Sequence, residues 1–324
     1  MRVLVVIVNY RSTSLAIDCL RSLAPEVAWL GGPGIARVVV TDNASGDDSV
    51  ARLTRAVADN GWRDWATIQP LARNGGFAYG NNEAIRAALA GPDKPEYVLL
   101  LNPDTLVRPG AIRALLDFMD AHPQAGIAGS RLEDPDGTPQ RSSFRFHTVR
   151  SELEAGLRLG FVSALLRRHV VAPPVPTGEA PVRTDWVAGA SMIVRRAVFE
   201  QAGLMDEAYF MYFEEVDFCL RAARKGWPCW YVPASRVVHL VGQSSGVTDT
   251  KQSNRRRPKY WFDSRRRYFL VNHGPVKTAL ADLAWSVGFA TYRLRQFLQR
   301  KPDRDPACLL RDFVKNSFLV AGRS

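Results

Sequence analysis

The chain has 324 residues, of which 46% are hydrophobic and 23% are charged. This composition is typical of a globular protein with a sizeable core and argues against a disordered chain. The formal net charge of +11 favours anionic partners such as phosphorylated small molecules, nucleic acid or an anionic membrane surface. The four cysteines are scattered without a CxxC pair, so we expect reduced thiols in a cytosolic protein and no zinc or redox site.

The first half of the chain alternates strand and helix patterns. Apolar runs typical of buried strands cover residues 3–8, 38–40, 97–101 and 125–129. Helical spacing of apolar residues covers 12–23, 49–57, 81–89 and 109–119. Asn9 interrupts the apolar start of the chain early, so we interpret that start as a strand and not as a signal peptide. Repeated β-α units predict an α/β fold with a mainly parallel sheet and helices on both faces.

A looser, proline-rich stretch over residues 133–183 separates the two halves. The second half predicts strands over 186–194 and 229–232 and helices over 197–202 and 216–225. From residue 255 onward, arginine triplets alternate with aromatic residues. The apolar segment 278–298 contains Asp282, Arg293 and Arg295, which predicts an amphipathic or packed helix and not a bilayer-spanning one.

Polar side chains follow three of the predicted strands. Asn9 and Tyr10 follow the first, Asp42 and Asn43 the second, and Asn102 and Asp104 the third. In parallel sheets, ligands bind beyond the carboxyl ends of the strands. An acid there can ligate a divalent cation that neutralises a diphosphate, and the alternative is that Asp104 caps the following helix.

Three acids, Glu214, Glu215 and Asp217, lie at the start of a predicted helix between aromatic residues. One interpretation is the ordinary preference of acids for a helix N-terminus. The aromatic flanks favour a second interpretation, a carboxylate that stays ionised at neutral pH and removes a proton from a hydroxyl group. His239 follows a predicted strand and is either a structural histidine or a metal ligand beside Asp104.

Seven segments, in this order, resemble glycosyltransferase family 2 and its rhamnosyltransferase-like branch over roughly residues 1–246. They are VVIVNYRS (5–12), VVVTDNASGDDS (38–49), RNGGFAYGNN (73–82), LLLNPDT (99–105), WVAGASMIVRR (186–196), GLMDEAYFMYFEEVDFCLR (203–221) and VVHLVGQSSG (237–246). The resemblance implies a GT-A fold, a Rossmann-like domain over residues 1–250. Residues 1–125 would bind the nucleotide sugar, residues 126–250 the acceptor, and residues 251–324 would form a basic helical extension.

The resemblance also implies roles for individual residues. The donor side would comprise Asn9, Tyr10, Asp42, Arg73, Asn74, Gly75 and Asn102, and the acceptor side Trp186, Gly189 and Asp217. Asp104 matches the last acid of the family's metal-binding Asp-x-Asp, whose first acid is replaced here by Asn102. Asp104 and His239 would therefore hold Mg²⁺ or Mn²⁺. Glu215 matches the catalytic base of an inverting displacement, with Glu214 as the second choice.

The implied activity is transfer of a sugar, L-rhamnose from dTDP-L-rhamnose in this branch, to an acceptor hydroxyl in cell-wall or surface polysaccharide synthesis. UDP and GDP donors stay open, as do a lipid-linked glycan, a polysaccharide, a glycolipid or a small natural product as acceptor. The arginine-rich, aromatic segment suggests a cytoplasmic protein that docks on an anionic membrane, while a dimer contact is the alternative. A catalytically inactive GT-A fold that acts as a binding module is the main rival to an enzyme. We do not expect nucleic acid as a partner, because it would explain the charge but not the acids at the strand ends.

Overall fold

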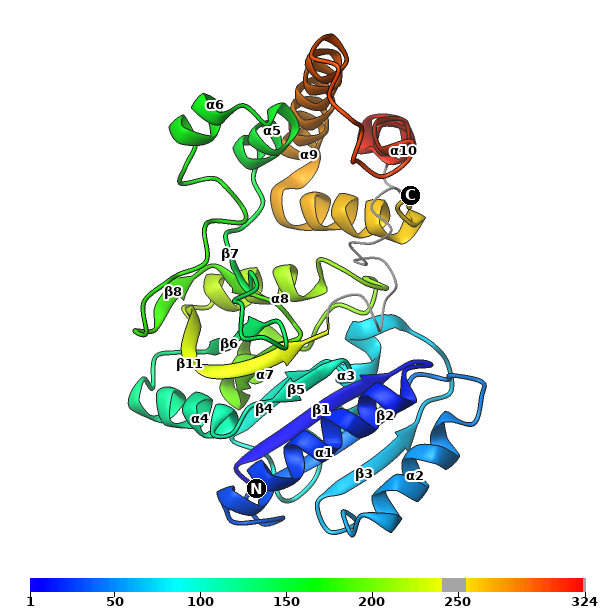
Figure 1. The fold of residues 1–324 in the computed structure, drawn as a ribbon, viewed down its shortest axis with the longest axis vertical. Helices are drawn as coiled ribbons and strands as arrows, with labels where there is room; N and C mark the ends of the chain where they lie inside the picture. The colour runs from blue at the N-terminus through cyan, green and yellow to red at the C-terminus, as the bar shows by residue number, and fades with distance from the viewer. Residues whose placement is uncertain (241–254, 323–324) are drawn as a thin grey trace. The chain divides into compact units, whose positions relative to one another are not determined.

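The computed structural model describes residues 1–240 and 255–322 (Figure 1). Residues 241–246 of the last family-like segment therefore lie outside the described part. The chain divides into two compact units. The first comprises Met1–Ser143, Pro174–Phe210 and Glu214–Gly246, and the second comprises Phe144–Pro173, Met211–Phe213 and Val247–Ser324. That residues 144–173 group with the C-terminal helices was not expected from the sequence.

The helices and strands of the first unit follow the β-α alternation expected from the sequence. The strands are β1 (Val3–Asn9), β2 (Ala36–Asp42), β3 (Ala66–Pro70), β4 (Tyr97–Leu101), β5 (Thr105–Val107), β6 (Ile127–Glu133), β8 (Val182–Thr184), β9 (Trp186–Val187), β10 (Ser191–Arg195) and β11 (Cys229–His239). The helices are α1 (Thr13–Leu30), α2 (Ser49–Asp59), α3 (Gly76–Ala90), α4 (Ala111–Ala121), α7 (Arg196–Ala202) and α8 (Glu214–Arg224). The short strand β7 (Ser143–Phe144) pairs with β9.

The main sheet has the strand order β3-β2-β1-β4-β10-β6-β11-β5, and β8 adds to β11. Strands β3, β2, β1 and β4 are parallel, β10 is antiparallel to both of its neighbours, and β11 is parallel to β6. The mainly parallel sheet is thus confirmed, with β10, β5 and β8 running against the others.

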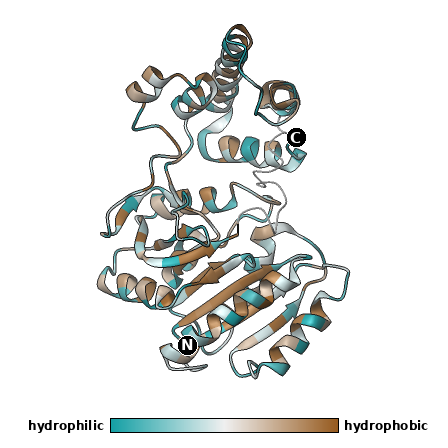
Figure 2. Ribbon diagram, viewed as in Figure 1, coloured by the Kyte–Doolittle hydropathy of each residue, from teal (hydrophilic) through white to brown (hydrophobic). Residues whose placement is uncertain are grey.

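Strand β1 shows why the sheet is covered on both faces. All of its seven residues are buried, and Figure 2 shows the strand as hydrophobic along its length. Side chains of a strand alternate between faces, and Val5 and Ile7 pack with Leu20 and Leu23 of α1. On the opposite face, a Cβ atom at Gly80 would lie 2.6 Å from Val8, so α3 approaches β1 more closely than any side chain at that position allows.

Two sequence predictions of strands were wrong in detail. The single strand expected over residues 186–194 is two strands, β9 and β10, because the small residues between them form a turn in which Ser191 N–H donates to Ala188 O at 3.4 Å. The strand expected over 229–232 continues to His239 through an irregularity between Val232 and Arg236. The short strands β3 and β5 were not predicted.

The second unit is helical, with α5 (Val149–Leu157), α6 (Gly160–Leu165), α9 (Lys259–Leu298), α10 (Leu309–Asn316) and α11 (Phe318–Ala321). A kink at Gly274, which has φ 78°, precedes Pro275 and divides α9. Helix α5 packs closely on α9, since a Cβ atom at Gly156 would lie 2.7 Å from the Trp285 carbonyl oxygen. Within the described ranges, every helix is too short or too polar to span a bilayer.

Two arginines of the triplets, Arg265 and Arg266, are buried in this helical unit. The Arg265 side chain is 4% exposed and forms ion pairs with Glu152 at 2.7 Å and Asp282 at 2.6 Å. These carboxylates compensate the buried guanidinium, and the Phe313 ring lies 4.5 Å from it. The expectation that the triplets face an anionic membrane is therefore wrong for Arg265.

Candidate active site

A buried cluster of polar residues, Asn9, Asp42 and Ser45, lies at the carboxyl ends of β1 and β2. Parallel pairing places Asn9 beside Asp42, and Asn9 Nδ2 donates to Asp42 Oδ1 at 2.7 Å. Ser45 completes the cluster, because its Oγ donates to Asp42 Oδ1 at 2.6 Å and its N–H donates to Asp42 Oδ2 at 3.0 Å. Both Asn9 and Asp42 are buried, whereas Tyr10 is exposed at the same edge.

A glycine-containing loop enters α3 beside this cluster. The Asn43 side chain donates to Asn74 Oδ1 and to the Gly76 carbonyl oxygen, both at 3.0 Å, and accepts from Gly75 N–H at 3.3 Å. Gly76 has φ 84°, and a Cβ atom there would lie 1.8 Å from the Phe210 carbonyl oxygen. The predicted residues Asn74 and Gly75 are thus held in a fixed turn by Asn43, one of the polar residues that follow the second predicted strand.

Arg73 precedes this turn, and its guanidinium lies 4.5 Å from the centre of the Tyr79 ring. Asn102 lies at the end of β4, where its N–H donates to Ala190 O at 3.0 Å. Arg73 lies in the loop between β3 and α3, and Asn102 in the loop between β4 and β5; both were predicted for the donor side.

Asp104 and His239 come together through strand pairing. β5 and β11 are antiparallel with His239 opposite Thr105, and Leu240 N–H donates to the Asp104 carbonyl oxygen at 2.9 Å. The distance between Asp104 Oδ1 and His239 Nε2 is 3.6 Å. Two ligands about 2.1 Å from one octahedral ion lie about 3 Å apart, so a small shift would let both bind one cation.

The donor chemistry of this pair fits a divalent cation, since it combines a carboxylate and an imidazole. Among the described residues, no group of three His, Cys, Asp or Glu side chains could hold a metal ion. A cation at Asp104 and His239 would need further oxygen ligands, which a diphosphate or water can supply.

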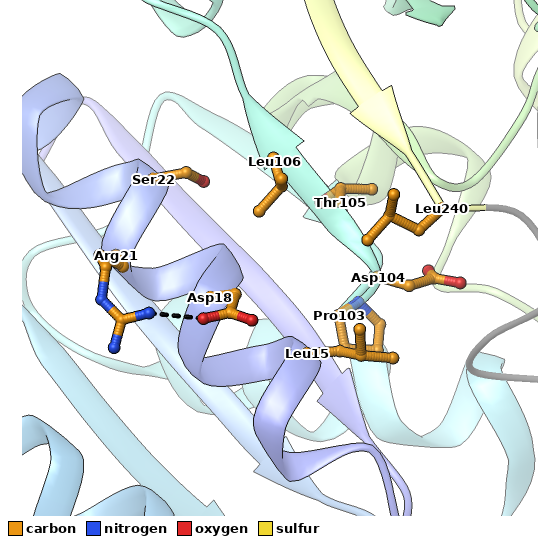
Figure 3. Close-up of a pocket in the computed structure, with 9 residues that line it drawn as sticks. All are labelled: Leu15, Asp18, Arg21, Ser22, Pro103, Asp104, Thr105, Leu106 and Leu240. Atoms are coloured by element: carbon orange, nitrogen blue, oxygen red, sulfur yellow. Dashed lines mark hydrogen bonds and ion pairs between the residues drawn. The ribbon is translucent and has the colours of Figure 1, made fainter. Parts of the chain in front are cut away.

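A cavity of about 350 Å³ adjoins Asp104 (Figure 3). Its lining comes from α1 and from the segment around β5, and comprises Leu15, Asp18, Arg21, Ser22, Pro103, Asp104, Thr105, Leu106 and Leu240. The Asp18–Arg21 ion pair lies on the α1 side of the cavity. The walls are mainly apolar around this pair.

Glu214 and Glu215 begin α8, where Glu214 is buried, Glu215 is partly buried, and the Oε2 atom of each is inaccessible to solvent. Their Oε2 atoms have no hydrogen-bond partner in the described part of the chain. Burial raises the pKa of Glu215 from 4.5 to about 7, and burial together with the charge of Glu215 raises that of Glu214 well above its usual range. The sequence predicted full ionisation at neutral pH, whereas a pKa of about 7 gives about half, because loss of hydration outweighs the backbone N–H groups of the helix start.

Gly189 leaves room beside Glu215. A Cβ atom at Gly189 would lie 3.9 Å from Glu215 Cβ and 3.2 Å from the Phe77 ring. Trp186, which was also predicted for the acceptor side, lies in β9, and β9 packs against α8. The predicted base and two predicted acceptor residues thus belong to one neighbourhood.

Asp217 lies one turn of helix α8 further on and is buried in an ion pair. Its Oδ2 accepts from Arg221 Nε at 2.7 Å, and Arg221 also donates to the Leu204 carbonyl oxygen at 2.9 Å. Asp217 therefore fastens the loop that leads toward Glu214.

The two residues before α8 have an unusual backbone. Tyr212 and Phe213 both adopt left-handed conformations, with φ values of 69° and 68°. For residues with a side chain, this conformation costs about 1–2 kcal/mol each. Such strain is concentrated at functional sites. Sequence reasoning missed this feature, because aromatic residues carry no signal for a positive φ.

Comparison with known proteins gives the site its context. The sequence family described as "Glycosyltransferase like family 2" matches residues 1–258. The N-acetylglucosaminyl-diphospho-decaprenol L-rhamnosyltransferase of Mycobacterium tuberculosis is 31% identical over 243 residues, which cover 68% of this chain and 76% of the relative. Rhamnosyltransferase WbbL of Escherichia coli is 26% identical over 168 residues, which cover 51% of this chain and 61% of WbbL.

Two solved structures resemble the whole chain. GalNAc-T7 with UDP, GalNAc and Mn²⁺ has a TM-score of 0.60 at 15% identity, and the match covers 98% of this chain and 54% of that protein. Mannosyltransferase PcManGT of Pyrobaculum calidifontis, in complex with GDP-Man and Mn²⁺, has a TM-score of 0.52 at 16% identity and coverages of 97% and 86%. The expected GT-A fold is confirmed.

Proposed function

Because this chain belongs to glycosyltransferase-like family 2, we propose that it transfers L-rhamnose from dTDP-L-rhamnose to a hydroxyl group of a lipid-linked glycan, with inversion of the anomeric carbon. The observation that carries the proposal is the meeting of Asp104 and His239, distant in sequence, at 3.6 Å beside the ends of the strands. The sugar and the acceptor class follow the rhamnosyltransferase from M. tuberculosis.

The donor would lie along the edge formed by β1, β2 and β4. Tyr10 is exposed there and presents a ring to the nucleoside, while the Asn9–Asp42 pair supports that edge from below. Asp42 Oδ2 accepts from Ser45 N–H, and a carboxylate oxygen has room for a further donor, such as the imide N–H of a thymine base. Arg73, Asn74 and Gly75 would line the nucleotide, with Asn102 at the end of β4.

Asp104 and His239 would hold Mg²⁺ or Mn²⁺, which neutralises the charge that develops on a departing nucleoside diphosphate. The Asp104 side chain is 1% exposed, and in such a site the attraction between a carboxylate and a cation is stronger than in water.

Glu215 would act as the base. Its carboxylate accepts the proton of the acceptor hydroxyl while that oxygen attacks the anomeric carbon and the bond to the diphosphate oxygen breaks. A base with a pKa of about 7 is half ionised at neutral pH and holds the proton more firmly than an ordinary carboxylate. Glu214 would keep its own proton and so avoid a second buried charge beside Glu215.

The acceptor would approach over Gly189 and Trp186, because the missing side chain at Gly189 leaves space next to Glu215. The retained set of Asp104, His239 and Glu215 favours an enzyme over a fold that only binds sugars. A small natural product as acceptor would give the same donor site and would differ only in this region.

An exposed apolar face of α9 supports contact with a membrane that carries the acceptor. Its members recur at helical spacing and are each about half exposed or more: Val276, Leu280, Leu283, Val287 and Leu294. Lys277 and Arg300 of the same unit are exposed, and residues 255–322 contain more lysine and arginine than acid, which suits anionic lipid.

The test is a transfer assay with purified protein. dTDP-L-rhamnose, UDP-N-acetylglucosamine and GDP-mannose are each offered with N-acetylglucosaminyl-diphospho-polyprenol and Mn²⁺. Rhamnosylated product from dTDP-L-rhamnose alone supports the proposal, and product from another donor overturns the choice of sugar. Sedimentation with anionic and neutral vesicles tests the membrane contact, with Leu283→Glu expected to abolish binding and exposed Arg55→Glu of α2 as the control.

A further inference from the structure

The segment Met211–Phe213 is held by the first half of α9. Ser264 Oγ donates to the Met211 carbonyl oxygen at 2.9 Å. The Tyr212 ring stacks on Tyr260 with centroids 6.2 Å apart. These contacts lie within the second compact unit, to which residues 211–213 belong.

Phe213 is enclosed by aromatic side chains of the same helix. Its ring centroid lies 5.6 Å from that of Tyr268 and 6.1 Å from that of Trp261. Phe213 is 6% exposed and Tyr268 is fully buried. Because the left-handed backbone at residues 212 and 213 is unfavourable by itself, the packing of these rings must maintain it.

The peptide bond after Phe213 leads directly into Glu214, the first residue of α8. The φ and ψ angles of Tyr212 and Phe213 therefore set the direction in which the chain enters the helix. Relaxation of either residue to a right-handed conformation would turn the first residues of α8, and with them Glu214 and Glu215.

We propose that Ser264 and Tyr268 of α9 are positioning residues for the catalytic base: they hold Met211–Phe213 in its left-handed conformation, and this conformation aims Glu215 at the acceptor hydroxyl. The inference rests on the proposed role of Glu215 as the base.

The serine pair gives a matched test. Ser264→Ala removes the hydrogen bond to Met211, and Ser317→Ala removes an equivalent buried bond, from Ser317 Oγ to the Val314 carbonyl oxygen at 2.8 Å, elsewhere in the same unit. We expect the kcat of Ser264→Ala to fall about tenfold, with the KM for the donor unchanged. The acidic limb of its kcat–pH profile should move to lower pH, because a displaced Glu215 carboxylate would be better hydrated. Ser317→Ala should keep the wild-type kcat and pH profile. Equal kcat and equal pH profiles in the two variants would overturn the proposal.

A second pair tests the ring. Tyr268→Leu should lower kcat. Tyr268→Phe keeps the ring against Phe213 and should have the wild-type kcat. Phe313→Leu, which removes a buried ring of α10, is the control for lost aromatic packing. Tyr268→Leu and Phe313→Leu with the same kcat would contradict the inference. Glu215→Gln distinguishes a failure of the proposed base from a failure of the positioning proposal. Full turnover in Glu215→Gln refutes the role of Glu215 as the base. Loss of turnover in Glu215→Gln together with wild-type turnover in Ser264→Ala refutes only the positioning role.

Discussion

Replacement of Glu215 by glutamine tests the base through two independent properties. The amide keeps the shape of the side chain but cannot accept the proton of the acceptor hydroxyl. Loss of a positioned base lowers turnover by about 100-fold to 10,000-fold. Binding of the nucleotide should be unchanged, because the predicted donor residues lie on the strand ends. We therefore expect Glu215→Gln to show the wild-type thermal shift with dTDP and Mn²⁺ while kcat falls by at least 100-fold.

The second property is the dependence of stability on pH. Burial raises the pKa of Glu215 from 4.5 to about 7, so ionisation is harder in the folded protein. The associated stability is fully present below pH 4.5 and is lost as the pH rises through about 7. At about 1.4 kcal/mol per pH unit, ionised Glu215 lowers the free energy of unfolding by about 3 kcal/mol at pH 8. Glutamine carries no such cost.

The assay is the unfolding midpoint of wild type and variant between pH 5 and pH 8. With an unfolding entropy of about 2 cal/mol/K per residue, 3 kcal/mol corresponds to about 5 °C for 324 residues. The midpoint of Glu215→Gln should exceed that of wild type by about this amount at pH 8 and by little at pH 5. Glu200→Gln, at an exposed position on α7, is the matched control. Parallel curves for wild type and Glu215→Gln would refute the burial argument.

Three further changes address other parts of the molecule. Asp104→Asn should weaken activation by Mn²⁺ at least tenfold in a metal titration, and unchanged activation would remove Asp104 from the metal site. Gly76→Ala should destabilise the protein by about 3 kcal/mol or more in urea unfolding, because its new methyl group meets the Phe210 carbonyl, whereas Gly34→Ala has open space and should change little. Arg265→Met should cost about 3–5 kcal/mol, since two buried carboxylates lose their partner, and an unfolding midpoint equal to wild type would contradict that.

The strands of the sheet could be predicted because their signal is local. Strand β4 begins and ends where the apolar run does, at Tyr97 and Leu101, since a strand buried on both faces needs apolar residues throughout. The polar residues that follow such strands must then lie at one edge. The predicted pairing of Asp104 with His239 could be stated for the same reason, and the structure places the two side chains 3.6 Å apart.

Other features depend on partners distant in the sequence. Arg265 belongs to a triplet that suggests a solvated surface, and only its contacts with Glu152 and Asp282 reveal a buried position. The pKa of Glu215 depends on how many groups exclude water from it, which no local pattern encodes. The left-handed residues Tyr212 and Phe213 are held by packing against α9, so their conformation could not be predicted either.

The two halves of the proposed reaction are therefore positioned by different means. On the donor side, strand pairing fixes Asn9 beside Asp42 and His239 opposite Thr105. This pairing is made by backbone hydrogen bonds, so it tolerates changes of side chain on either strand. Glu215 is not part of a strand; it follows a strained turn that ring packing and the hydrogen bond from Ser264 to Met211 maintain. Substitutions in the first half of α9 should thus alter kcat and acceptor choice while donor binding survives. A helical addition of this kind offers a route by which one donor site can serve different acceptors.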